Sequence, residues 1–111
     1  MSKIISVKGK EEFQKVIAEN KGVIVDFYAD WCGPCKKLGE IFKAKIGSGN
    51  GWVVAKIDVD EEENGVLAEE AGVSGIPQVD LYIGGKQTEK FVGFNENKLN
   101  SFIDKAAEQY Q

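Results

Sequence analysis

Hydrophobic and polar positions alternate along this chain in blocks that predict strands and helices in turn. Residues 23–28, Val-Ile-Val-Asp-Phe-Tyr, form a nearly continuous β-branched and aromatic run, which is typical of a central strand buried on both faces. Phe13, Val16 and Ile17 before this run share the spacing of one helix face, and Gly22 is expected to end that helix.

The rest of the chain shows the same two patterns, one typical of strands and one typical of helices. Residues 78–83 alternate polar and apolar, Gly84-Gly85 favours a tight turn, and residues 90–92 return, which predicts an antiparallel hairpin. The other predicted elements are a strand at 4–7, a helix that begins at Cys32 and carries Leu38, Ile41 and Phe42, a flexible loop at 47–51, a strand at 52–58, a helix capped by Asp60 and ended by Gly72, and a last helix capped by Asn95 or Asn97. The order βαβαβαββα predicts an α/β fold, a central mixed sheet with helices on both faces.

Length and composition narrow the class of protein. A chain of 111 residues predicts one domain over residues 1–111. The net charge is −4 and all fourteen basic residues are lysine, so the bidentate arginine contacts typical of phosphate recognition are excluded and no nucleic-acid partner is expected. No apolar run approaches the ~20 residues that span a bilayer. Residues 1–8 lack the apolar core of a signal peptide, so we expect a cytoplasmic protein with no membrane association. We also expect a monomer.

The chain has no histidine and only two cysteines, Cys32 and Cys35. The missing histidine excludes Ser-His-Asp and Cys-His catalysis. A structural zinc site needs about four thiolate or imidazole ligands, so zinc would have to be shared across a dimer, and no metal is expected.

The cysteine pair stands at the predicted start of a helix. Pro34 is tolerated there because the first helical turn does not use its missing N–H, and the unpaired N–H groups of that turn favour a thiolate. Cys35 follows Cys32 by almost one turn, on the same face. The alternative, a permanent cross-link, would constrain the unfolded chain little over so short a loop and does not suit a cytosolic protein. The spacing therefore indicates a redox-active pair.

The run from Val25 to Lys36, with Trp-Cys-Gly-Pro-Cys at 31–35, resembles the active-site stretch of the thioredoxin family almost residue for residue. Gly75-Ile76-Pro77 is similar to the cis-proline loop of that family, and Val92-Gly93 to its substrate-groove glycine. The resemblance extends over essentially the whole chain, including the order of elements. It implies the thioredoxin fold.

The resemblance also implies catalytic roles. Cys32 would be the exposed nucleophile, and Cys35, one turn inward, would resolve the mixed disulfide. Asp26 lies within an apolar strand, where burial should raise its pKa and suit it to exchange a proton with Cys35. The alternative is a core aspartate that is capped or satisfied by water. Lys56 matches the family lysine beside this aspartate, although a solvated lysine at a strand end would give the same pattern.

The remaining implied residues would face the substrate. Trp31 would form an apolar wall beside the nucleophile, with a plain surface aromatic as the alternative. Pro77 would be cis, which would leave the backbone of Ile76 open to pair with an extended substrate. The implied substrate-binding residues are Trp31, Gly33, Pro34, Ile76, Pro77 and Gly93.

Three positions depart from the family pattern. Glu40 replaces a proline five residues after the second cysteine, which leaves open whether the helix is straight or bends at Gly39. Gln78 replaces the threonine that usually follows the cis-proline, and Phe94 stands where a small residue is common. Gln78 and Phe94 are expected to line or flank the substrate groove and to affect the choice of partner.

Together these features predict a general protein-disulfide reductase. The resemblance implies disulfide-containing protein substrates, no bound cofactor, and recharging by a thioredoxin reductase that draws on NADPH. Two alternatives remain open: a thioredoxin-fold subunit that binds a partner through its Trp31–Pro77–Gly93 surface without redox chemistry, and a disulfide oxidase or isomerase.

Overall fold

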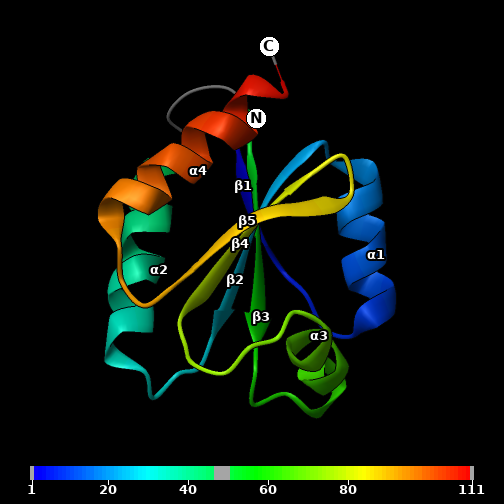
Figure 1. Ribbon diagram of the computed structural model, residues 1–111, viewed down its shortest axis with the longest axis vertical. Helices are drawn as coiled ribbons and strands as arrows, with labels where there is room; N and C mark the ends of the chain where they lie inside the picture. Colours follow the sequence, from blue (N-terminus) through cyan, green and yellow to red (C-terminus); the bar gives the residue numbers. More distant parts are fainter. Residues whose placement is uncertain (1, 47–50, 111) are drawn as a thin grey trace.

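The computed structural model describes residues 2–46 and 51–110 (Figure 1). Residues 47–50 of the predicted flexible loop lie outside them. The elements in chain order are β1 (Lys3–Ser6), α1 (Lys10–Glu19), β2 (Gly22–Tyr28), α2 (Gly33–Lys45), β3 (Val53–Asp58), a 3₁₀ turn η1 (Glu62–Asn64), α3 (Gly65–Glu70), β4 (Gln78–Ile83), β5 (Lys86–Val92) and α4 (Glu96–Glu108). The predicted order of strands and helices is confirmed.

The five strands form one mixed sheet in the order β1-β3-β2-β4-β5. β1, β3 and β2 run parallel, and β4 pairs antiparallel with both β2 and β5. The mostly apolar composition of β2 suits a central strand, and every residue of the strand except Tyr28 is buried. The α/β fold class with a mixed sheet is confirmed.

Each face of the sheet carries its own hydrophobic core, and two helices cover each core. Figure 1 shows α1 and α3 on one side of the sheet and α2 and α4 on the other. Successive β2 side chains alternate between the cores: Val23, Val25 and Phe27 pack with α1 and α3, whereas Ile24 packs with α2 and α4. By the same alternation Asp26 belongs to the α2 and α4 face.

Gly22 does not end α1, contrary to the sequence prediction. The helix ends at Glu19, and the next residue, Asn20, is already extended. Gly22 is instead the first residue of β2, where a Cβ atom would lie 2.5 Å from the carbonyl oxygen of Ala106 in α4. The hydroxyl of Tyr110 accepts from the Gly22 N–H at 3.2 Å and donates to its carbonyl at 3.0 Å. This glycine therefore serves the close approach of the last helix.

The predicted helix cap at Asp60 is also wrong, because η1 intervenes and Asn64 precedes α3. The cap at Asn95 is confirmed, since its side chain accepts from the backbone N–H of Lys98 at 3.0 Å. The tight turn at Gly84-Gly85 is confirmed by φ angles of 60° and 82°. Within residues 2–46 and 51–110, no helix is long and apolar enough to cross a membrane.

Candidate active site

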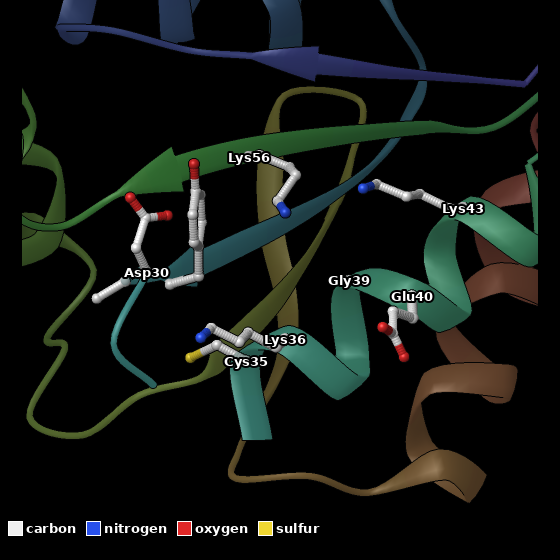
Figure 2. A pocket seen from close by; sticks show the side chains of 9 residues that line it. Asp30, Cys35, Lys36, Gly39, Glu40, Lys43 and Lys56 are labelled. Carbon is white, nitrogen blue, oxygen red and sulfur yellow. The ribbon is translucent and has the colours of Figure 1, made fainter. Parts of the chain in front are cut away.

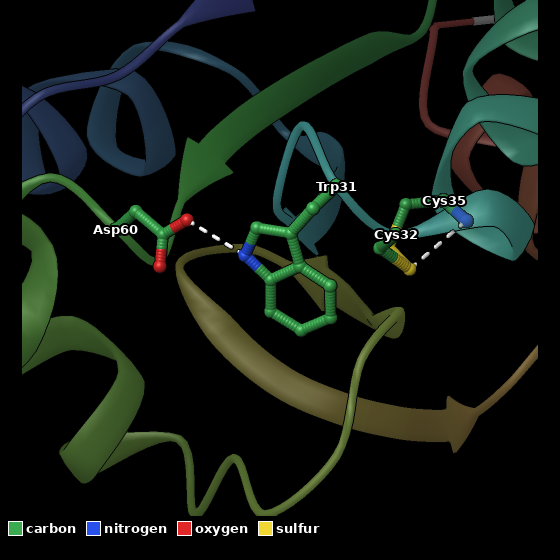
Figure 3. Close-up of a disulfide and its surroundings, with 4 residues drawn as sticks. All are labelled: Trp31, Cys32, Cys35 and Asp60. Carbon is green, nitrogen blue, oxygen red and sulfur yellow. Dashed lines mark hydrogen bonds between the residues drawn. A yellow bond between two sulfur atoms is a disulfide. The ribbon is translucent and has the colours of Figure 1, made fainter.

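The cysteine pair lies where the chain leaves β2 and enters α2. Cys32 is the N-cap of α2, and its sulfur accepts a hydrogen bond from the backbone N–H of Cys35 at 3.2 Å (Figure 3). The two residues form a disulfide with their Cα atoms 5.2 Å apart. Pro34 occupies the first helical turn, as predicted. The helix N-terminus thus supplies N–H donors to a sulfur that carries negative charge after reduction.

The predicted difference in exposure between the two cysteines is absent from the disulfide form. Cys32 is 5% exposed and Cys35 is 3% exposed, so neither sulfur-bearing residue protrudes. They form one buried cluster with Ala29, against which Tyr28, Val59 and Ile76 pack. Gly33 and Pro34 between them are exposed and form the outer surface of the pair.

Trp31 borders this surface as an exposed but anchored side chain. It is 71% exposed, and its indole Nε1 donates to Oδ2 of Asp60 at 2.9 Å (Figure 3). The ring forms one wall of a hollow of about 440 Å³ lined by Trp31, Val59, Ala68, Val73, Ser74, Gly75 and Ile76. The fixed indole agrees with the predicted apolar wall better than with a free surface aromatic. Asp60, expected from the sequence to cap a helix, is a member of the site that the sequence did not reveal.

The cis-proline loop and the groove glycine meet beside the disulfide. The Ile76–Pro77 peptide bond is cis, as the resemblance implied. The N–H of Gly93 donates to the carbonyl of Pro77 at 2.7 Å, and Gly93 has a φ of +85°, a backbone conformation that suits glycine. Ile76 is half-buried against the cysteine pair.

Asp26 is fully buried, and neither of its carboxyl oxygens has a hydrogen-bond partner among the residues that the structure describes. Burial raises the pKa of the Asp26 carboxyl to about 7, and the positive charge of Lys56 opposes the shift. Lys56 is the neighbour of Asp26 in the register of β2 and β3. No described residue caps the Asp26 carboxyl, so the capped form of the alternative is wrong.

A second hollow, of about 450 Å³, opens on the other side of Cys35. It is lined by Tyr28, Ala29, Asp30, Cys35, Lys36, Gly39, Glu40, Lys43 and Lys56. The amino group of Lys56 lies 4.2 Å from the centre of the Tyr28 ring and points toward α2, where the missing side chain of Gly39 leaves room (Figure 2). Lys56 is half-buried and lines this hollow.

The three departures from the family pattern occupy different environments. Glu40 is exposed on α2, which runs without interruption from Gly33 to Lys45. Phe94 is half-buried, and the amino group of Lys37 lies 4.5 Å from the centre of its ring. Gln78 is buried directly after the cis-proline, so its side chain can flank the groove but does not line its exposed surface.

Comparison with known proteins identifies the family. A family model described as Thioredoxin matches residues 4–105. The chain belongs to the thioredoxin family. It is 39% identical over 98 residues to the thioredoxin of Mycoplasmoides gallisepticum, covering 87% of this chain and 96% of that protein. It is 37% identical to thioredoxin-1 of Schizosaccharomyces pombe over 97 residues, which are 87% of this chain and 92% of that protein.

Solved structures agree with this assignment. A mutant thioredoxin from Halobacterium salinarum superposes with a TM-score of 0.84 at 38% identity, and the match covers 96% of this chain and 95% of that one. The family together with the Cys32–Cys35 disulfide makes this thioredoxin-family chain a protein-disulfide oxidoreductase. In residues 2–46 and 51–110, no group of three or more His, Cys, Asp or Glu side chains is placed to hold a metal ion.

Proposed function

We propose that the reduced chain transfers two electrons to disulfides of protein substrates, through Cys32 first and Cys35 second. The Cys32 thiolate attacks one substrate sulfur, the substrate S–S bond breaks, and the departing thiolate takes up a proton. The Cys35 thiolate then attacks the Cys32 sulfur, the mixed disulfide bond breaks, the second substrate sulfur leaves as a thiolate that takes up a proton, and the Cys32–Cys35 disulfide forms. The observation that carries this proposal is the disulfide at the N-terminus of α2.

Asp26 is the proposed proton acceptor for Cys35. Its carboxyl has a pKa of about 7, so both protonation states are populated near neutral pH. Lys56 supports a connection between the two groups, because it neighbours Asp26 in the sheet register and lines the same hollow as Cys35. A proton leaving the Cys35 thiol can pass through this hollow toward the β2 carboxylate.

The substrate-binding surface combines backbone and apolar groups. We assign the backbone of Ile76 to pairing with an extended substrate segment, because the Ile76–Pro77 bond is cis and Ile76 packs against the cysteine pair. Trp31 and the hollow beside it would take an apolar substrate side chain. Gly33, Pro34 and Gly93 complete the surface around the disulfide.

The proposed electron source is NADPH, delivered by a thioredoxin reductase that would contact the same surface as the substrate. The chain itself would carry no bound cofactor and would act as a monomer. A cytoplasmic location suits this role, because cytosolic thiols are kept reduced. Insulin reduction with NADPH, with and without a thioredoxin reductase, tests this part: activity that does not depend on the reductase would contradict it.

The two cysteine roles are tested by single substitutions. Cys32→Ser is expected to abolish insulin reduction, because the attacking sulfur is lost. Cys35→Ser is expected to accumulate a mixed disulfide, visible by mass spectrometry, since attack occurs and resolution does not. Turnover of Cys35→Ser at the wild-type rate would contradict the assignment. The double variant with serine at both positions separates the redox role from a binding role, because a binding subunit would keep its function.

A further inference from the structure

Gln78 follows the cis-proline directly, and its side chain is 1% exposed, on the side of the sheet away from Asp26. Its amide nitrogen donates twice: to the carbonyl of Ala71 at 3.1 Å and to Oδ1 of Asp80 at 3.0 Å. An amide nitrogen has two hydrogens, so both are used. A flipped amide would bring its oxygen against two other acceptors, which fixes the orientation of the Gln78 side chain.

Ala71 is the C-cap residue directly after α3, so its carbonyl lacks an intrahelical partner. The chain then turns at Gly72 and runs toward β4. The N–H of Val73 bonds back to Ala68 at 2.9 Å. From Ser74 to Ile76, the structure gives no hydrogen bond to another described residue. The Gln78–Ala71 bond therefore ties the start of β4 to the end of α3 across the loop that contains this unbonded stretch.

The same stretch forms one wall of the hollow beside Trp31, through Val73, Ser74, Gly75 and Ile76. Its position relative to Trp31 therefore sets the shape of that hollow. Asp80 has no place in the disulfide chemistry, because it is fully buried on the face covered by α1 and α3. Its oxygen does, however, orient the amide that holds the loop.

We propose that Gln78 and Asp80 are positioning residues that hold segment 73–76 in the shape that recognises protein substrates. This inference rests on the proposed function, since it concerns recognition by the same surface. A protein disulfide must fit along segment 73–76, whereas a small disulfide reaches Cys32 without it. Loss of the tie should therefore slow the reduction of proteins selectively.

The test compares two substrates of the reduced chain in single-turnover reactions: insulin, and the small aromatic disulfide 5,5′-dithiobis(2-nitrobenzoic acid). In Gln78→Met, which keeps the side-chain length without the amide, the rate constant for insulin is expected to fall about 3- to 10-fold, the range of one net hydrogen bond. The constant for the small disulfide should stay within about twofold. A ratio of the two constants equal to that of wild type would overturn the proposal.

Three further variants separate positioning from stability. Asp80→Asn keeps an oxygen acceptor for the Gln78 amide and should retain the wild-type ratio, whereas Asp80→Leu should lower it. Thr88→Val removes another side-chain bond to the backbone, from Thr88 Oγ1 to the Leu81 carbonyl at 3.2 Å in the same hairpin, and should leave the ratio unchanged. If the ratio of the insulin to the small-disulfide rate constant in Thr88→Val were as low as in Gln78→Met, the effect of Gln78 would be one of general stability, and the positioning role would be overturned.

Two other outcomes also decide the matter. If Gln78→Met does not fold, the same ratio is measured in Gln78→Thr, whose β-branched side chain suits a strand but is too short to reach Ala71. An unchanged ratio there also overturns the proposal. Failure of the wild-type chain to reduce insulin, with the small disulfide still reduced, would contradict the proposed function rather than the positioning role.

Discussion

Two buried carboxyl groups lie on opposite faces of the same sheet and have different surroundings. Asp26, on the α2 face of β2, has no hydrogen-bond partner at either oxygen within the described part of the chain. Asp80, on the α1 face of β4, accepts from Gln78 at one oxygen and leaves only the other unpaired among those same residues. Burial raises the pKa of both carboxyls. For Asp80, the hydrogen bond from Gln78 is the main effect that opposes the rise in pKa.

The contrast agrees with the different roles proposed for the two carboxyls, proton exchange for Asp26 and positioning for Asp80. An ionised Asp26 is held by a lysine charge alone, so it is costly at neutral pH and readily accepts a proton. An ionised Asp80 is held by a directed hydrogen bond whose donor also fixes a loop. Keeping Asp26 buried thus lowers the stability of the fold, a cost that agrees with the proposed role of the carboxyl in the reaction.

The largest expected effect comes from Asp26→Ala. The pKa is 3.8 in the unfolded chain and about 7 in the folded one, so the folded state holds an extra proton between these values. The free energy of unfolding of wild type therefore falls as pH rises from about 4 to about 7. That of the variant does not fall in this way, because the variant lacks the carboxyl. We expect the free energy of unfolding of Asp26→Ala to exceed that of wild type by about 2–4 kcal/mol at pH 8, with little difference at pH 4.

Denaturant midpoints of both proteins from pH 4 to pH 8 measure this difference. Resolution of the mixed disulfide should also slow in the variant at pH 7, because Cys35 loses its proton acceptor. Asp104→Ala, at an exposed position of α4, is the control and should change stability by no more than about 0.5 kcal/mol. If the free energy of unfolding of wild type instead rose relative to that of Asp26→Ala as pH increases, the role given to burial would be contradicted.

Lys56→Met tests the one group that offsets the burial of Asp26. Without the lysine charge, the pKa of Asp26 should rise further, and stability should then continue to fall at pH values where wild type has levelled off. We expect a loss of about 1 kcal/mol at pH 8, roughly one pKa unit. The carboxyl ¹³C shift of Asp26 reports the titration directly. Lys43→Met, in the same hollow but on α2, should shift this titration less.

The smallest effect is expected for Asp80→Asn. The variant removes a carboxyl whose pKa is raised by burial, so it should gain stability at pH 8 relative to pH 4, but less than Asp26→Ala because a hydrogen bond already holds the charge. Rates of disulfide reduction should stay within about twofold of wild type. Urea midpoints and single-turnover rates check both expectations. A slowed reaction with small disulfides would mean that the two carboxyls do not have separate roles.

Features set by local pattern were predictable from the sequence. The apolar run of β2 determines its central place, and the glycine pair at 84–85 determines the hairpin turn. The cysteine pair at the start of α2 followed from spacing and from Pro34. The cis bond before Pro77 came from the family resemblance, because an X-Pro dipeptide alone carries little information about its isomer.

Features set by distant contacts were missed. Asp60 has the residue type of a helix cap, but its partner is the indole of Trp31, 29 positions earlier. Gln78 has the polarity of a surface residue, but the end of α3 and Asp80 supply its hydrogen bonds inside the protein. Cys32 was expected to protrude, yet Ile76 and Val59 pack against the cysteine pair. In each case the deciding neighbour is brought close only by the tertiary fold.

The contact between Gly22 and Tyr110 bears on when the protein can finish folding during its synthesis. The two residues are 88 positions apart, yet the tyrosine hydroxyl closes the first hydrogen bonds of the central strand. At about 5–20 residues per second, the ribosome needs roughly 4–18 s to make the intervening chain. Until α4 has been made, the apolar run of β2 lacks one of the two helices that cover its α2 and α4 face. The core between the sheet and helices α2 and α4 can therefore close only after the end of α4 has been made.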